Sequence, residues 1–521
     1  MDTLLDKLGT KVNGTITGFD RIVFKGIVRP IMHSAGMESF LLARRIKNKD
    51  FKSYVMAQSQ LIVKSAEEIS KRECGQKVSY IPSINERKEE LAHRRQSEAG
   101  ISEGLIGIWS CVESCHTFRS VFDPLNTYPT LRVEKSKCKH LYYYLDHPVY
   151  GFMSIRLQTW APYEIQIALN GREWLRRSLD DAGCGYHVCG NKFLHIDDYG
   201  LAQDLLDAQA KVDFGSVLEH LLPSAFPCMR EVLGPGLSYY WTFWQSEVAR
   251  DYIFKSTDEL SALMGDFQLH ALITGNGKRI LKYFGSPVKK DGNPHQKTNP
   301  EIVSRTDTWY DGLRVRHWND TNSVKLYNEH NVLRFEMTMN NPKKFKIHRY
   351  AQGQDKTEPK QFLPMRKGVA DTTARFDVSK NILNRFTEHM SALEERTRLG
   401  SLLALSASPV ASRGKNFRAL DPFGKDNELL CSVSDSKYDV HAITNKQLQK
   451  ALVGTAWAKG MTGKRLSGRI SRHLRLLREH GLIRKLPNQR KYTLTDKGRR
   501  LTAAVDIALA ASVNELLKLA A

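Results

Sequence analysis

Four acidic residues stand within clearly patterned segments and are the candidates for catalysis: Asp20, Glu164, Glu247 and Glu336. A metal-dependent nuclease needs two to four carboxylates that converge on Mg²⁺, a cation that prefers oxygen ligands. No fixed spacing links these acids. The sequence therefore names candidate ligands for Mg²⁺ without showing that they meet in space.

Three cysteines and a histidine form a second candidate metal site, with the pattern C-x3-C and C-x-H: Cys111, Cys115, Cys138 and His140. Thiolate and imidazole are ligands that tetrahedral Zn²⁺ prefers. Cys111 and Cys115 fall in an expected strand, where residues four apart share a face but lie about 13 Å from each other. Both can bind one ion only if the strand bends, and buried free cysteines are the alternative.

Residues 312–349 alternate between apolar and polar side chains, which predicts a three-stranded antiparallel meander with one apolar face. The cations on its other face or directly after it are Arg314, Arg316, Lys325, Arg334, Lys343 and Lys344. Cations interleaved with Tyr327 are typical of a surface that follows a phosphate backbone, and Glu336 can hold a metal there. Plain solvent exposure of one sheet face is the alternative.

The segment SVKLYNEHNVLRFEMTM in this meander is similar to a strand pair of rolling-circle replication initiators. That resemblance implies nicking of a DNA strand by a tyrosine nucleophile. In this chain Ser323 stands where that nucleophile is expected, so Tyr327 or Tyr310 would have to replace it.

The most specific pattern lies near the C-terminus, in RLSGRISRHLRLLREHGLI. Its apolar residues fall within an arc of about 80° on a helix, and arginines occupy the opposite side; the apolar residues are Leu466, Ile470, Leu474 and Leu477. A short helix precedes this segment, and two strands and a last helix at 498–518 follow it. The run resembles the core of MarR- and ArsR-like winged-helix domains.

That resemblance implies a recognition helix in the major groove of DNA and a wing on the backbone or minor groove. The expected contacts are Arg465, Arg469, Arg472 and Arg475 in the helix, with Arg490 and Lys491 in the wing. From Lys464 to Arg500 there are 13 Lys or Arg and two acidic residues, a net charge of +11. A solvated helix face or a protein-binding winged helix is the alternative, and the charge favours nucleic acid.

The whole chain has 521 residues and a net charge of +22, from 78 Lys and Arg against 56 Asp and Glu. Half of this excess lies in the C-terminal segment, so a polyanion is the expected partner. Eight cysteines are too few for a disulfide framework, and a reduced chain is expected. Without a secretory signal or an apolar run of 18 residues, we expect a cytoplasmic protein with no membrane partner.

The order of the expected elements predicts an α+β fold. Residues 12–28 are expected to form a β-hairpin that turns near Gly18–Asp20, and 152–170 a second hairpin before a helix. Residues 198–272 are predicted to be mainly helical. Trp241 and Trp244 would then be core residues of a helix, with base stacking as the alternative.

We expect four regions and one long loop. They are an N-terminal α+β region at 1–225, a helical and meander region at 226–398 with a loop at 284–306, a linker at 399–440, and the winged helix at 441–521.

Several segments together resemble a broad family of uncharacterised bacterial and archaeal proteins with several copies per genome. They include GFDRIVFKGIVRP, HPVYGFMSIRLQTWAPYEIQIALNGREWL and MRKGVADTTARFDVS, and the resemblance spans most of residues 15–390. It implies a mobile-element origin and carries over no catalytic residue.

The expected function is nucleic-acid binding in a mobile-element or replication system, with the winged helix on duplex DNA and the body on DNA or RNA, with or without strand cleavage. A transcriptional regulator with a large sensor body and an RNA-binding ribonucleoprotein component are the alternatives. No nucleotide cofactor is expected, because the chain has neither a G-x-x-x-x-G-K-[ST] loop nor a strand–GxGxxG–helix unit. The oligomeric state stays open, a dimer included.

Overall fold

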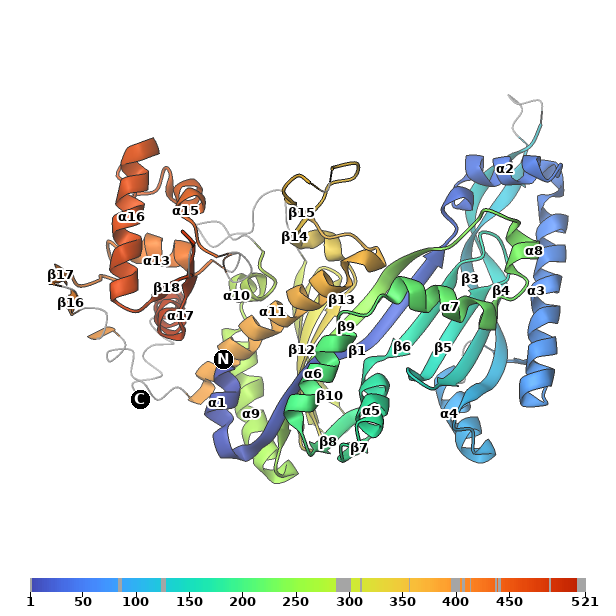
Figure 1. The fold of residues 1–521 in the computed structure, drawn as a ribbon, viewed down its shortest axis with the longest axis horizontal. Helices are drawn as coiled ribbons and strands as arrows, with labels where there is room; N and C mark the ends of the chain where they lie inside the picture. Colours follow the sequence, from blue (N-terminus) through green and yellow to red (C-terminus); the bar gives the residue numbers. More distant parts are fainter. Residues whose placement is uncertain are drawn as a thin grey trace. The chain divides into compact units, whose positions relative to one another are not determined.

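The computed structural model describes residues 2–82, 87–122, 128–286, 301–309, 312–355, 357–394, 403–404, 408–412, 414–435, 438, 442–486 and 489–512. The fold is α+β, as expected, and contains one large mixed sheet (Figure 1). The chain divides into two compact units. The sheet unit comprises Leu8–Gln268 and Val303–Lys380, and the C-terminal unit comprises Met1–Lys7, Leu269–Ile302 and Asn381–Ala521.

The large sheet has eleven strands in the order β10-β11-β12-β13-β9-β1-β6-β5-β4-β3-β2. From β11 to β3 each strand pairs antiparallel with the next, and β2 pairs parallel with β3. The strands are β1 (Val12–Ile27), β2 (Ser79–Tyr80), β3 (Gly104–Val121), β4 (Thr130–His147), β5 (Gly151–Gln158), β6 (Ile165–Asn170), β9 (Tyr240–Phe254), β10 (Ile302–Trp309), β11 (Gly312–Asn319), β12 (Asn322–Glu329) and β13 (Val332–Met339).

Within the described residues there are four smaller sheets, which have two strands each. They pair β7 (Tyr186–Cys189) with β8 (Lys192–Ile196), β14 (Lys346–Arg349) with β15 (Gln361–Pro364), β16 (Val410–Ser412) with β17 (Lys415–Phe417), and β18 (Ile483–Lys485) with β19 (Tyr492–Leu494).

The helices of the first 290 residues are α1 (Thr3–Leu8), α2 (Ser34–Ala43), α3 (Phe51–Cys74), α4 (Lys88–Ala99), α5 (Gly171–Asp181), α6 (Tyr199–Gln209), α7 (Phe214–Ala225), α8 (Met229–Leu233), α9 (Thr257–Thr274) and α10 (Gly277–Tyr283). Those that follow are α11 (Thr372–Met390), α13 (Asn427–Val433), α15 (Asn445–Leu452), α16 (Gly463–Glu479) and α17 (Asp496–Ala510). Among the described residues, no helix combines the length and the apolar character needed to cross a membrane.

Residues 12–27 form one long strand, so the predicted hairpin at 12–28 is wrong. β1 pairs with β9 along its whole length, and the expected turn is instead a β-bulge at Asp20, between Phe19 and Arg21. Gly18, which suggested a turn, instead allows α6 to pack closely against β1. A Cβ atom there would lie 2.4 Å from the side chain of Leu206 in α6.

α6 borders the part of β1 that β6 does not reach. The Gln203 amide accepts a hydrogen bond from the Thr17 N–H at 2.8 Å and donates one to the Thr17 carbonyl at 3.0 Å. These bonds satisfy backbone groups that a neighbouring strand would otherwise pair. In this part of β1 the helix therefore takes the place of a neighbouring strand, and the backbone groups of Thr17 are not left unpaired.

Strand β9 corrects the expectation of a mainly helical segment at 198–272. It lies between β1 and β13 in the sheet, although it is flanked in sequence by α8 and α9. Of its aromatic residues, Trp241 and Phe243 are buried, Tyr240 is partly exposed and Trp244 is exposed. The predicted boundary at 225 therefore does not divide the structure, since one sheet includes strands from both sides of it.

The predicted meander at 312–349 is present as β11, β12 and β13, and the 152–170 hairpin as β5 and β6. The expectation that one face of the meander is wet is wrong for β12 and β13: every residue of β13 is buried, and only two residues of β12 are partly exposed. In β11 five of the eight residues are partly exposed. Residues of α5 and of the β7–β8 segment contact the polar face: Arg172 pairs with Asp251, and Lys192 pairs with Glu329. Its charged residues must therefore pair within the protein.

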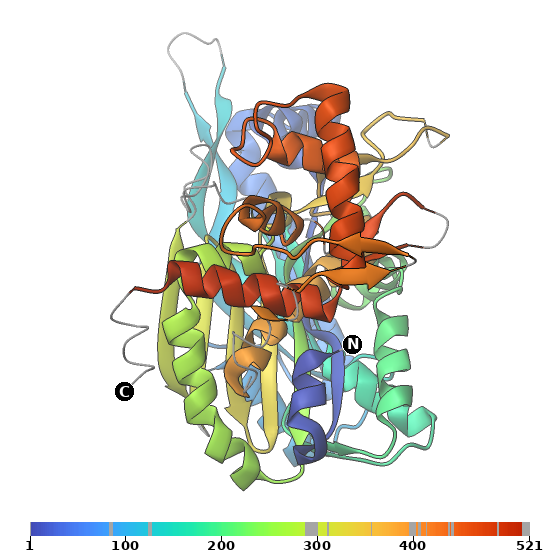
Figure 2. The same ribbon diagram turned by 90° about the vertical axis from the view of Figure 1, so that its left-hand side faces the viewer.

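The C-terminal unit contains α15, α16, β18, β19 and α17, drawn in orange and red in Figure 2. Their buried apolar side chains belong to one core. The stripe of α16 that the periodicity predicted, Leu466, Ile470, Leu474 and Leu477, is fully buried in this core. Thr444 and Gln447 form a capping box that begins α15.

The predicted linker at 399–440 is wrong in its second half, because Leu420, Leu429, Leu430 and Val433 belong to the same core. Other predicted segments lie outside the described residues. They are most of the loop at 284–306, the end of the last helix beyond residue 512, and Tyr310.

Candidate carboxylate site

Three of the four predicted acids converge in the sheet unit. Asp20, Glu247 and Glu336 each offer a carboxylate oxygen, and these oxygens lie within 4.8 Å of one another. Within the described residues, this is the group of three or more His, Cys, Asp or Glu side chains that is close enough to share a metal ion. The side chains are 10%, 15% and 4% exposed, respectively, so the cluster is largely buried.

Three adjacent strands bring these acids together. Glu247 of β9 lies opposite Thr338 of β13 and opposite Arg21 of β1. Glu336 lies two residues before Thr338 and therefore on the same face of the sheet. Asp20 is the extra residue of the β1 bulge, a feature that redirects a side chain and is common next to functional sites.

Lys325 of β12 lies opposite Glu336 and contacts its carboxylate. The same ammonium group is 4.0 Å from Glu247. Two hydroxyl groups also donate to Glu336, from Tyr327 at 3.1 Å and from Thr338 at 3.2 Å. The Glu336 carboxylate is thus held in place by three side chains.

A pair of buried arginines balances the acids beside the cluster. Arg334 binds Asp251 through two hydrogen bonds, at 2.6 and 2.7 Å, and lies 3.0 Å from Asp20. Arg172 is 3.0 Å from Asp251. Burial alone would raise the pKa of both aspartates, but the nearby positive charges outweigh it and hold each pKa below its usual value.

Glu247 is in a different electrostatic position. Burial, and next the negative charge of Glu336, raise the pKa of Glu247 to about 7. Lys325 opposes this rise, but it sits closer to Glu336. Near neutral pH Glu247 is therefore partly protonated, whereas an ordinary glutamate would be fully ionised.

The donor set fits a hard divalent cation. Carboxylate oxygens from three strands are the ligands that Mg²⁺ and Mn²⁺ prefer. Burial is the larger cause of the raised pKa of Glu247 and the charge of Glu336 is the second, and a cation between the two carboxylates would offset both effects. Asp20, Glu247 and Glu336 are the residues that would hold such an ion.

The other predicted catalytic residues lie differently. Glu164 forms an ion pair with Lys25 at 2.7 Å and is not part of the cluster. Tyr327 is next to the cluster but buried, and burial, followed by the charge of Glu336, raises its pKa well above the usual value. A phenol kept protonated in the core is a poor nucleophile, so we do not propose tyrosine-based nicking for Tyr327.

The meander cations were expected to meet nucleic acid, and for Arg334 and Lys325 the structure argues otherwise, whereas Arg314 and Arg316 are partly exposed. Arg334 is fully buried, and Lys325 belongs to the carboxylate site. Arg314 pairs with Asp307 at 3.0 Å, and Arg316 donates to Ser323 at 3.1 Å. Lys343 and Lys344 are exposed, and Lys344 contacts Asp320.

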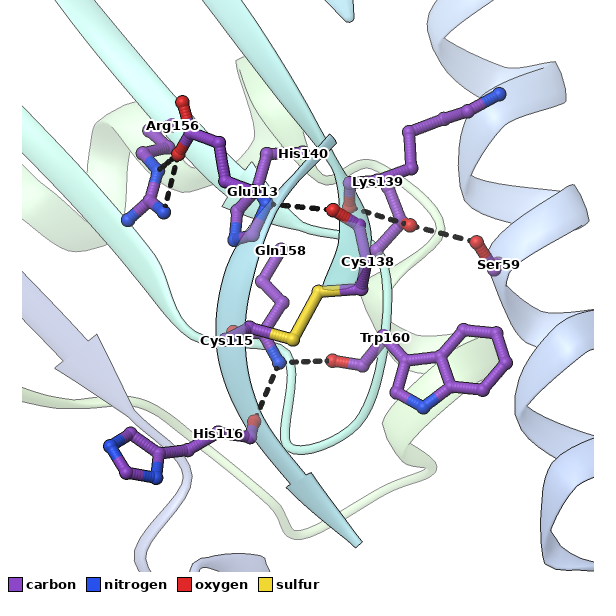
Figure 3. The surroundings of a disulfide bond; sticks show 11 residues. Ser59, Glu113, Cys115, His116, Cys138, Lys139, His140, Arg156, Gln158 and Trp160 are labelled. Atoms are coloured by element: carbon purple, nitrogen blue, oxygen red, sulfur yellow. Dashed lines mark hydrogen bonds and ion pairs between the residues drawn. A yellow bond between two sulfur atoms is a disulfide. The ribbon is translucent and has the colours of Figure 1, made fainter. Parts of the chain in front are cut away.

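The predicted zinc ligands lie close together on β3 and β4 but do not form a four-ligand site. Cys115 and Cys138 form a disulfide, and Gln158 beside it donates to backbone carbonyls of His116 and Trp160 (Figure 3). A disulfide sulfur is not a thiolate ligand. The expectation of a fully reduced chain is wrong for this pair. Cys111 is buried and lies opposite His140. Burial lowers the pKa of His140 to about 4.

The arginines of α16 lie on the side of the helix opposite its apolar stripe, as the helical periodicity predicts. Arg465, Arg472 and Arg475 are exposed, whereas Arg469 is partly covered and lies 4.6 Å from the Trp457 ring. The two wing candidates, Arg490 and Lys491, are also exposed.

Sequence reasoning missed the partners that complete the carboxylate site. Arg172 and Asp251 were not singled out, and Lys325 was assigned to a surface. If β9 had been recognised as a strand, alternation would have placed Asp251 on the same face as Glu247, but its position beside Arg334 depends on the order of the strands. No protein-family model, curated protein or solved structure matches the chain.

Proposed function

We propose that this protein is a nucleic-acid-binding protein whose sheet unit cleaves phosphodiester bonds with a divalent metal ion. The observation that carries the proposal is the convergence of Asp20, Glu247 and Glu336 from three adjacent strands. The net charge of +22 supports a polyanionic substrate.

The metal ion, when bound, would supply a Lewis acid and an activated water for attack on phosphorus. The side chains of the protein position the metal-binding carboxylates and set their ionisation. Lys325 and the Tyr327 hydroxyl orient Glu336, while Arg334 fixes Asp20 and keeps it ionised. Glu247, whose pKa is about 7, can hold or release a proton near neutral pH.

The test is metal-dependent cleavage by the full-length protein. Labelled single-stranded DNA, single-stranded RNA and duplex DNA are incubated with Mg²⁺ or Mn²⁺, and products are resolved on gels. We expect Glu336→Gln to lower the cleavage rate by about 100-fold or more. The matched control is Glu113→Gln, which alters another ion-paired carboxylate of the sheet, 2.8 Å from Arg156, outside the cluster.

An equal rate in wild type and Glu336→Gln would contradict the proposal, as would the absence of any metal-dependent cleavage. Tight sequence-specific duplex binding without cleavage would instead favour a transcriptional regulator with a large sensor body. RNA that copurifies and is removed by ribonuclease would favour a ribonucleoprotein component.

We further propose that the winged helix predicted at 441–521 binds duplex DNA through α16, in a mobile-element or replication system. The exposed arginines on the side of α16 opposite its buried stripe favour this function. In this arrangement β18 and β19 would form the wing, with Arg490 and Lys491 close to its tip.

The test compares two triple variants in duplex binding at several salt concentrations. We expect Arg465→Ala, Arg472→Ala and Arg475→Ala together to weaken binding and to reduce the salt slope by about 3. The control removes the same charge from exposed positions of another helix, α3: Lys52→Ala, Lys64→Ala and Lys71→Ala. Equal losses in the two variants would contradict a specific role for α16.

A further inference from the structure

Trp244 is an exposed aromatic residue beside the carboxylate site. Its relative exposure is 48%, the largest among tryptophans whose side chains the structure describes. It lies on β9 three residues before Glu247, a separation of about 10 Å along a strand. Strand β9 bulges here, since Phe24 pairs with Phe243 but Val23 already pairs with Gln245.

The Trp244 ring lies on the same face of the sheet as the carboxylates. Arg21 and Lys25 of β1 share one face, because they are four residues apart in a regular stretch paired with β6. Arg21 lies opposite Glu247, and the ammonium group of Lys25 is 5.0 Å from the centre of the Trp244 ring. The bulge therefore turns this tryptophan toward the side where the acids converge.

Two lysines from distant segments flank the ring. Lys367 approaches it to 5.8 Å, and Lys25 pairs with Glu164 as well. Lys367 is held in place because its carbonyl accepts a hydrogen bond from the Phe243 N–H at 2.8 Å. Burial, and then the charges of Lys343, Arg375 and Lys25, lower the pKa of Lys367. Positive charge is thus crowded around an exposed indole ring.

We infer that Trp244 is a stacking platform for an unpaired nucleobase, with Lys25 and Lys367 beside the adjoining phosphates. Exposed aromatic rings among cations are how proteins hold single-stranded nucleic acid, because every base has a face that can stack. A base inside a duplex is already stacked on both sides. The substrate class is therefore single-stranded nucleic acid, and this inference rests on the proposed cleavage function of the same face.

The experiment measures binding without cleavage, in EDTA, by fluorescence anisotropy of the full-length protein. The probes are a labelled single strand of about 12 nucleotides, as DNA and as RNA, and a blunt DNA duplex. We expect Trp244→Ala to weaken single-strand binding by about 10- to 100-fold and to leave duplex binding unchanged. Trp244→Phe, which keeps a stacking face, should restore most of the affinity.

The matched control is Tyr80→Ala, which removes an aromatic side chain of 59% exposure from β2 at the sheet edge. Thermal melts establish that each variant is folded. As a second readout, a strand carrying 5-bromouracil is photocrosslinked, and the adduct is located by mass spectrometry. We expect it on the peptide that contains Trp244.

Equal affinity of Trp244→Ala and Tyr80→Ala for the single strand, or adducts confined to other peptides, would overturn the inference. The outcome is separable from the proposed function. Single-strand binding through Trp244 without any metal-dependent cleavage would remove the nuclease proposal alone. Cleavage that persists in Trp244→Ala with unchanged binding would remove this inference alone.

Discussion

The polar face of the meander and the outer face of α16 are both rich in arginine, but the two regions use it in opposite ways. In the sheet, Arg334 is fully buried and held between Asp20 and Asp251. On α16, Arg465 and Arg472 are exposed, and the helix carries one acidic residue, Glu479, at its C-terminal end. The charge of Arg334 is therefore paired with acids inside the protein, whereas the charges of the exposed α16 arginines remain available to a partner.

This difference shows that the number of cations in a segment does not identify a binding surface. Whether a cationic segment can bind a partner depends on two things: whether acidic residues of neighbouring strands or helices pair with its cations, and whether its face is exposed. A buried arginine must be paired because an uncompensated buried charge is very unfavourable. An exposed arginine needs no partner, so its field extends to a polyanion in solution.

The largest expected effect is on stability, from Arg334→Ala. This substitution leaves Asp20 and Asp251 buried with too little positive charge, and we expect a loss of about 3–5 kcal/mol in the free energy of unfolding. Urea denaturation at pH 7 measures it. In the wild type the pKa of both aspartates is lowered, so their pairing stabilises the fold above the ordinary aspartate pKa and is lost as the pH falls.

The difference in the free energy of unfolding between wild type and Arg334→Ala should therefore become smaller toward pH 3. A variant as stable as the wild type at pH 7 would show that this arginine is not structural, and the contrast with α16 would fail.

The next effect, of opposite sign, is expected from Glu247→Gln. The native pKa of Glu247 is about 7 and lies above its value of 4.5 in the unfolded chain. Ionised Glu247 therefore destabilises the fold, by an amount that grows from about pH 4.5 and levels off above about pH 7. We expect the variant to be about 1–3 kcal/mol more stable than the wild type at pH 8 without metal, and equally stable at pH 4. Urea denaturation at the two pH values measures this, and a variant less stable at pH 8 would contradict it.

The smallest effect is expected from Arg472→Ala on the exposed face of α16. Because this side chain is exposed, we expect the free energy of unfolding to change by no more than about 0.5 kcal/mol. The same denaturation experiment as for Arg334→Ala provides the comparison. A loss of several kcal/mol would show that α16 uses its arginines for internal pairing, as the sheet does.

The sequence was most informative where the pattern is local. The stripe from Leu466 to Leu477 identified the buried side of α16, because helical periodicity depends only on the segment itself. Asp20, Glu247 and Glu336 were selected as acids within patterned segments, but their meeting depends on β9 lying between β1 and β13. That order joins strands more than 200 residues apart, and local spacing carries no information about it.

Two errors have the same origin. Asp20 was expected in a turn because Gly18 precedes it, whereas this glycine accommodates Leu206 of a helix that is distant in sequence. The meander was expected to have a wet face, because alternation shows which residues share a face but not what covers it. Non-local packing decides both questions.

Direct measurement of metal binding tests the central claim, that Asp20, Glu247 and Glu336 form a divalent-cation site. Mn²⁺ is titrated into the metal-free, full-length protein at pH 6 and pH 8, and binding is followed by calorimetry and by the electron paramagnetic resonance of free Mn²⁺. We predict one site that requires Glu336. It should bind roughly tenfold more weakly at pH 6 than at pH 8, because Glu247 must first lose its proton. Binding that is the same in wild type and Glu336→Gln, or no saturable binding at either pH, would contradict the claim.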